Sequence, residues 1–250
     1  MMKTIGIVAE GPRDFDLLSA VIDVITGQEN NYHRIQPEQD ARGEFGNGWK
    51  GVWRWCECNH GKLNTYMNSL TPKIDLLIIH MDGDVQRCEK EVHCDCQRNK
   101  CKMTKTTHPL KCETLIKYKQ LCPVNLPCDI HGNDINTKAE FLRSFLNKML
   151  LPEQDLPISY VIPCDATDTW IVAALDDYDA YEILPDPWER IIAKASTYHG
   201  IKIKNRPHKN QRTYWELITI VCNNWNLVVE RCSQAKKFDE DVRKYIIENK

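Results

Sequence analysis

The sequence predicts an α/β protein with a mainly parallel sheet that is covered by helices on both faces. Apolar runs at 3–9, 74–80 and 157–164 are typical of buried strands. Segments in which apolar residues recur at helical spacing lie between these runs and after them. Strands that alternate with helices favour a parallel sheet, because each parallel connection has to cross the sheet and brings a helix onto one face.

The first strand, KTIGIVA at residues 3–9, leads directly into an expected helix. Pro12 stands where a helix can begin and Gly27 where it can end. An acid, Glu10, lies between the strand and the helix. The apolar residues that repeat at helical spacing in this segment are Leu17, Leu18, Val21, Ile22 and Ile25.

The segment between the first strand and the strand at 74–80 is less regular. Four glycines in GEFGNGWKG, residues 43–51, predict a loop, and VWRW at 52–55 is interpreted as a short strand. A helix is expected over 61–70, just before the strand at 74–80.

The second half of the chain is mostly helical in this interpretation. NTKAEFLRSFLNKMLL, residues 136–151, has the pattern of an amphipathic helix, and the strand at 157–164 follows it. Asp165 or Thr167 is expected to cap the next helix. We predict three regions from these patterns: a catalytic α/β domain over 1–175, a Cys-rich insertion within it at 86–133, and a helical region over 176–250.

Composition excludes several classes of protein. The chain of 250 residues is 42% hydrophobic and 27% charged, which is typical of a globular protein. Its net charge of -2 argues against a generally basic protein that coats nucleic acid, but it permits a nucleic-acid enzyme with local positive charge. No apolar run reaches the length of a membrane span, and the N-terminus does not have the pattern of a signal peptide. We therefore expect a cytoplasmic protein.

Seven of the twelve cysteines lie between residues 86 and 133. In a reducing compartment such a cluster indicates metal ligands more than disulfides. No pair has CxxC spacing, so the prediction of a structural Zn²⁺ rests on the density of ligands and on the polar insertion's need for a cross-link. The free-thiol alternative stays open. We take as candidate zinc ligands the first four cysteines of this insertion, which lie close together in sequence: Cys88, Cys94, Cys96 and Cys101.

Acidic residues follow three of the expected strands, where an open parallel sheet places its ligand site. Glu10 ends the first strand, and Asp14 lies one helical turn further on. Asp82 and Asp84 follow the strand at 74–80 in KIDLLIIHMDGDV, and Asp168 follows the third strand. Each could be a turn or cap residue, but carboxylates gathered at one edge repel each other unless a cation holds them. Oxygen ligands of this kind suit Mg²⁺ or Mn²⁺.

These motifs resemble those of the Toprim domain, which topoisomerases, primases and OLD-type nucleases share. Glu10-Gly11 matches the family's glutamate after the first strand, and Asp82-Gly83-Asp84 matches its later DxD. Asp14 matches the second acid of the EGxxD form, and IPCDATDTW is similar to a segment that usually reads TEAW, with Asp168 in place of the glutamate. The resemblance covers residues 3–175 without the Cys-rich insertion.

The resemblance implies a nuclease that hydrolyses phosphodiester bonds of DNA or RNA. Asp82 and Asp84 would bind Mg²⁺, Glu10 would be a ligand or the general acid/base, and Asp14 with Asp168 would complete a second metal position. No tyrosine is marked as a covalent nucleophile, so hydrolysis is favoured over a topoisomerase mechanism. The resemblance also implies a role in bacterial defence beside an ATPase partner.

Nucleic acid requires positive charge, and the run IKIKNRPHKNQR supplies it. Its candidate phosphate-binding residues are Lys204, Arg206, Lys209 and Arg212, although the run could equally be a solvated loop between helices. Two other functions stay open. One is a Toprim-like module that binds nucleic acid or protein without cutting, and the other is a metal-dependent phosphatase.

Overall fold

The computed structural model describes residues 2–38, 45–86, 135–153, 156–178, 181–183, 187–193, 197–203 and 211–248. At its centre is a parallel sheet of four strands in the order β2-β1-β3-β4. The strands are β1 (Thr4–Val8), β2 (Asn31–Gln36), β3 (Leu76–His80) and β4 (Ile158–Val161). The predicted α/β class with a parallel sheet is confirmed, and β1, β3 and β4 lie where strands were expected.

Strand β2 was not predicted from the sequence. It lies at the edge of the sheet, where it pairs with β1 alone. Its sequence, NYHRIQ, is mostly polar, and most of its side chains are only half-buried. A strand that hides neither face completely lacks the apolar run by which buried strands are recognised.

Residues of the central strands alternate between the two faces of the sheet. Ile5 and Ile7 belong to one apolar core, whereas Val8 belongs to the other. On β3, Ile78 packs in the first core and Ile79 in the second. Both faces are therefore covered, as expected for a parallel sheet between two layers of helices.

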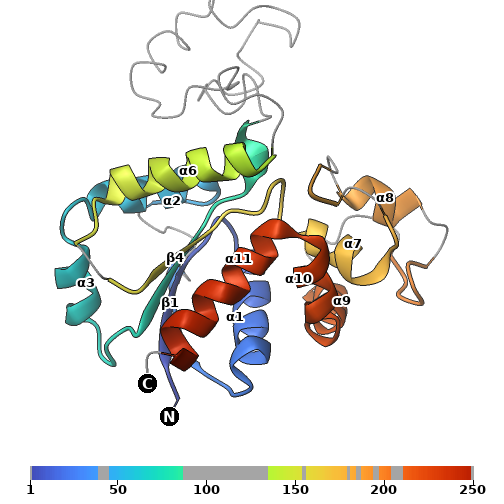
Figure 1. The fold of residues 1–250 in the computed structure, drawn as a ribbon, viewed down its shortest axis with the longest axis horizontal. Helices are drawn as coiled ribbons and strands as arrows, with labels where there is room; N and C mark the ends of the chain where they lie inside the picture. The colour runs from blue at the N-terminus through green and yellow to red at the C-terminus, as the bar shows by residue number, and fades with distance from the viewer. Residues whose placement is uncertain are drawn as a thin grey trace, which may run out of the picture.

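The first face carries α1 (Pro12–Thr26) and the helices near the C-terminus (Figure 1). As predicted, α1 starts at Pro12 and is terminated by Gly27. This C-cap glycine adopts a left-handed conformation with φ of 66°. The other helices of this layer are α7 (Thr169–Leu175), α9 (Gln211–Asn223), α10 (Trp225–Arg231) and α11 (Ser233–Val242), with α8 (Pro187–Ala193) beside them, a single turn at Tyr181–Ile183 and a final π-helical turn at Arg243–Glu248.

The second face carries α2 (Trp49–Cys58), α3 (Leu63–Ser69) and α6 (Ile135–Leu150), and α2 and α6 lie side by side (Figure 1). The helices expected near 61–70 and 136–151 are confirmed. The prediction of a strand at 52–55 is wrong, because these residues form the middle of α2. Val52, Trp55 and Cys56 bury one side of that helix against the sheet, and this burial outweighs the weak strand preference of Val and Trp.

The C-terminal helices share a single apolar core with α1 and α7. Trp170 on α7 lies edge-on to Trp225 on α10 and stacks on Phe238 of α11, with ring centroids 5.3 and 6.0 Å away. Trp215 on α9 lies outside this core and is 42% exposed. Helix α11 also contacts β4, so residues beyond 176 help to cover the sheet. No helix within the described ranges is long and apolar enough to cross a membrane.

Candidate metal centre

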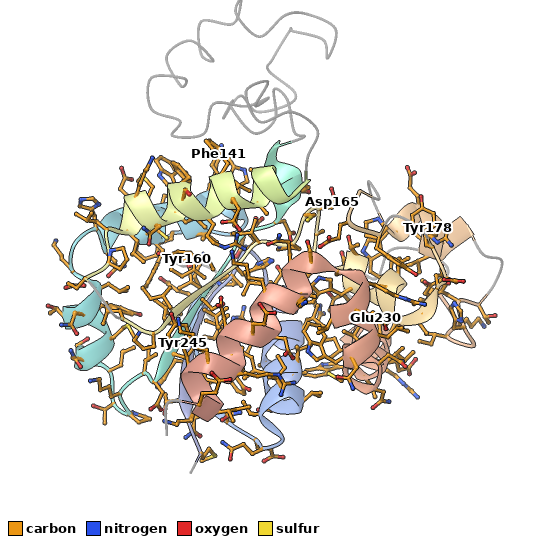
Figure 2. The ribbon with its side chains drawn as sticks, viewed as in Figure 1. Phe141, Tyr160, Asp165, Tyr178, Glu230 and Tyr245 are labelled. Carbon is orange, nitrogen blue, oxygen red and sulfur yellow. The ribbon has the colours of Figure 1, made fainter. Side chains whose placement is uncertain are left out.

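The carboxyl ends of β1, β3 and β4 bring the predicted acidic residues to one edge of the sheet. Glu10 comes two residues after β1, and Asp82 two residues after β3. Asp84 lies in a single 3₁₀ turn, Gly83–Gln86, and Asp14 lies in the first turn of α1. Asp165 lies in the loop that leaves β4 for α7 (Figure 2). This is the position at which open α/β sheets bind their ligands.

Glu10 and Asp82 are in direct contact. The backbone N–H of Asp82 donates a hydrogen bond of 2.8 Å to Oε1 of Glu10. The backbone carbonyl of Glu10 accepts a second bond of 2.8 Å from the N–H of Gly48, just before α2. Glu10 is therefore held by the loops that follow β1 and β3, and by the loop that leads into α2.

Gly83 allows the loops after β3 and β4 to approach closely. Its N–H donates to the carbonyl of Pro163 at 3.0 Å, and the N–H of Asp84 donates to the carbonyl of Asp165 at 2.9 Å. A Cβ atom at residue 83 would clash with the carbonyl oxygens of Pro163 and Cys164. The glycine between the two aspartates is thus required by the packing of one loop on the other.

Thr167 links Asp14 to Asp82. Its hydroxyl donates a 2.7 Å bond to Oδ1 of Asp14, and its backbone N–H donates a 3.2 Å bond to Oδ1 of Asp82. The sequence indicated Thr167 or Asp165 as the cap of the next helix, but Asp168 occupies that position and makes no capping bond with its side chain. Thr167 instead links Asp14 of α1 to Asp82 after β3. This role could be seen only in the tertiary structure.

His80, the last residue of β3, was not among the predicted site residues. Its side chain is completely buried, and its Nε2 lies 3.1 Å from Oδ1 of Asp82. One ligand atom each from Asp14, His80 and Asp82 lies within 4.8 Å of the other two. The sequence did contain a signal, because residues two apart on a strand share a face and His80 stands two residues before Asp82.

The acids change each other's protonation. Burial raises the pKa of Glu10 well above its usual value, and the charges of Asp82, Asp84 and Asp14 raise it further. Burial is also the main reason why the pKa of Asp82 rises to about 7, although the contact with His80 opposes the shift. Burial alone would lower the pKa of His80, but the neighbouring carboxylates outweigh it and raise the pKa.

Among the described residues, His80 is the one basic side chain found to pair with an acid of this cluster. Within the described parts of the chain, no Lys or Arg nitrogen lies within 4.0 Å of a carboxylate oxygen of Glu10, Asp14 or Asp82. Asp82 keeps 19% of its side chain exposed, so a small ion could reach it. Several carboxylate oxygens with one buried imidazole fit a divalent metal ion. A proton and a metal ion are then two alternative ways of holding the same cluster together.

Asp168, which was predicted to complete a second metal position, accepts hydrogen bonds from two aromatic side chains. Its Oδ2 accepts a 2.6 Å hydrogen bond from the indole N–H of Trp188, and its Oδ1 accepts a 3.0 Å bond from the hydroxyl of Tyr214. Both partners come from helices that follow α7, namely α8 and α9. Asp168 is not part of the Asp14–His80–Asp82 group. Its carboxylate is engaged in joining α7 to α8 and α9.

Most of the predicted basic and zinc-binding residues lie outside the residues that the structure describes. These are three of the basic residues, Lys204, Arg206 and Lys209, and all four expected zinc ligands, Cys88, Cys94, Cys96 and Cys101. These assignments stay predictions. Arg212, at the start of α9, has 90% of its side chain exposed and pairs with Glu216 at 3.3 Å.

The comparisons with known proteins add no assignment to this geometry. The chain matches no family model, no curated protein and no solved structure. The function therefore has to be argued from the residues at the carboxyl edge of the sheet.

Proposed function

We propose that the chain is a metal-dependent nuclease that hydrolyses phosphodiester bonds of DNA or RNA through a Toprim-type carboxylate site. The observation that carries the proposal is the meeting of Glu10, Asp14 and Asp82 at one sheet edge without a Lys or Arg ion pair among the described residues. Three mutually repelling acids are held there by specific hydrogen bonds. An arrangement that raises carboxylate pKa values in this way is more typical of a functional site than of a structural one.

Asp82 and Asp84 would hold the metal ion, and Glu10 stands beside them. A bound Mg²⁺ or Mn²⁺ supplies charge neutralisation at the scissile phosphate and lowers the pKa of a bound water. Glu10, whose pKa is raised by burial, would be the general acid that passes a proton to the leaving oxygen. The bond from the N–H of Asp82 orients Glu10 for this role.

Other residues at this edge would position the substrate and the ligands. Thr167 holds Asp14 and Asp82 in their places. Arg13, which precedes Asp14 and keeps 27% of its side chain exposed, supplies a positive charge on the same helix turn. Additional phosphate contacts are assigned to Lys204, Arg206, Lys209 and Arg212, and an ATPase partner and a part in bacterial defence belong to the proposal through the Toprim resemblance alone.

The proposal is tested by a cleavage assay on the full-length protein. Plasmid DNA, single-stranded DNA and tRNA would each be incubated in Mg²⁺, in Mn²⁺ and in EDTA. We expect cleavage of at least one substrate that requires metal, and we expect Glu10→Gln and Asp82→Asn each to lower the rate on the order of a hundredfold or more. These two variants keep the size of the side chain and remove its charge.

The matched control is Asp75→Asn, at the opposite end of β3. Asp75 accepts a hydrogen bond from the N–H of Thr4 and pairs with Lys3, far along the strand from Asp82. It should leave the cleavage rate unchanged. Intact nucleic acids in every condition would contradict the nuclease proposal, and hydrolysis of p-nitrophenyl phosphate in the same samples would favour the phosphatase alternative.

A further inference from the structure

His80 is an unusual residue to find at the end of a buried strand. The preceding residues that face the same side of the sheet, Leu76 and Ile78, are apolar core residues. His80 continues this row with an imidazole that has no exposed surface. Its Nδ1 has no hydrogen-bond partner among the residues that the structure describes. The other ring nitrogen, Nε2, is the one that faces a polar group, the carboxylate of Asp82.

The imidazole of His80 faces the cluster with its Nε2. Nε2 lies 3.1 Å from Oδ1 of Asp82, and two neighbouring ligands of one octahedral ion are about 3 Å apart. In the tautomer that carries its proton on Nδ1, the lone pair is on Nε2 and points toward Asp82. A lone pair on a buried imidazole is what a metal ion requires of a histidine ligand.

The geometry around His80 is close to that of a bound ion. One donor atom each from Asp14, His80 and Asp82 lies within 4.8 Å of the others. Two donors bound to one ion at about 2.1 Å cannot be more than about 4.2 Å apart. The three side chains would therefore have to move by only a fraction of an ångström to surround an ion.

We propose that Asp14, His80 and Asp82 form a mixed nitrogen–oxygen subsite that takes a divalent first-row transition-metal ion in preference to Mg²⁺. The inference rests on the proposed metal site and deepens it by naming the class of ion. Mg²⁺ favours oxygen ligands and water in octahedral geometry, whereas an imidazole ligand favours transition metals. Asp82 is then shared between this subsite and the all-oxygen ligands Glu10 and Asp84.

The first test measures binding of Mn²⁺ and Mg²⁺ to the EDTA-stripped full-length protein by calorimetry. We expect Mn²⁺ to bind at least tenfold more tightly than Mg²⁺. His80→Gln keeps a hydrogen-bond donor of similar reach but removes the imidazole, and it should reduce the Mn²⁺-to-Mg²⁺ affinity ratio about tenfold. His33→Gln, on the edge strand β2, is the control and should leave the ratio unchanged.

The second test asks directly whether nitrogen binds the ion. Electron spin-echo modulation of the Mn²⁺-loaded wild-type protein should show coupling to ¹⁴N, and the coupling should be absent in His80→Gln and present in His33→Gln. No ¹⁴N coupling in the wild type, or the same coupling in His80→Gln, would overturn the proposal. If His80→Gln does not fold, Asp14→Asn replaces it in the calorimetry, where an unchanged affinity for Mn²⁺ would equally overturn it.

These binding measurements are independent of cleavage. Coupling from His80 in a protein that cuts no nucleic acid would support the subsite and contradict the proposed nuclease. Cleavage that Mg²⁺ and Mn²⁺ support equally, without ¹⁴N coupling, would support the nuclease and overturn the subsite.

Discussion

Buried carboxylates near the two ends of α7 differ in their charged partners. At its C-terminal end, Asp176 has a side chain that is only 1% exposed. Arg190 donates a 2.8 Å bond to its Oδ2, and Nε2 of His199 lies 2.6 Å from its Oδ1. The arginine is always charged and supplies the counter-charge that a buried carboxylate needs.

Near the other end of α7, the cluster around Asp82 has no such arginine among the described residues. Its hydrogen bonds come from backbone N–H groups, from the hydroxyl of Thr167 and from His80. The protein pairs a buried acid with a permanent cation at Asp176, whereas at the sheet edge no Lys or Arg of the described residues pairs with Glu10, Asp14 or Asp82. The difference separates a carboxylate whose counter-charge is an arginine of the fold from a cluster that the proposed metal ion would neutralise.

The comparison can be tested by the same Asp→Asn substitution at Asp176 and at Asp82. Asp176→Asn leaves Arg190 and His199 without their shared carboxylate, so we expect it to lower the free energy of unfolding by about 3 kcal/mol. Urea unfolding followed by circular dichroism would measure the change. The control is Asp177→Asn at the next, fully exposed residue, which should leave the unfolding curve unchanged.

Asp82→Asn should have the opposite sign in the metal-free protein. It removes one of several charges that repel each other, so we expect it to raise the free energy of unfolding in EDTA by about 1 kcal/mol. The wild type should gain stability when Mn²⁺ is added, because the ion binds only the folded state, and Asp82→Asn should gain much less. Destabilisation by Asp82→Asn in EDTA would mean that Asp82 is a structural acid like Asp176.

The stability of the metal-free protein should also depend on pH. The pKa of Asp82 is raised from 3.8 to about 7, so between these values the folded state holds more protons than the unfolded state. The stability of the metal-free protein should therefore fall as pH rises from 4 to 7. Glu10 and His80 also have raised pKa values and act in the same direction.

Thermal unfolding in EDTA across this pH range measures the slope. Asp82→Asn should make the curve flatter, and the affinity for Mn²⁺ in the wild type should rise with pH because protons compete for the ligands. A metal-free wild type whose stability rises from pH 4 to 7 would contradict this prediction and show that acids outside the cluster dominate the titration.

Much of the site could be predicted because it depends on local rules. A buried strand can be recognised from its apolar run, and acids that follow parallel strands must meet at one edge of the sheet. Glu10, Asp14 and Asp82 were identified in this way, and the structure brings them together. The helix from Pro12 to Thr26 followed equally from its own proline and glycine.

The errors come from places where distant segments decide the outcome. VWRW became a helix because one side of it could be buried against the sheet. The contacts of Asp168 likewise depend on distant residues, because Trp188 and Tyr214, 20 and 46 residues further along the chain, donate hydrogen bonds to its carboxylate. Neither partner is marked by any local pattern.

The α/β class, the strands β1, β3 and β4 and the acids that follow them could be predicted from the sequence, because apolar runs and helical spacing are properties of short segments. Which of these acids form a group depends on contacts between distant segments. Thr167 and Asp14 are 153 residues apart in sequence and meet through one 2.7 Å hydrogen bond. His80 enters the site because β3 ends beside α1 and presents it to Asp14. Hydrogen bonds and charge interactions of this kind act through space, so the order of residues along the chain does not specify them.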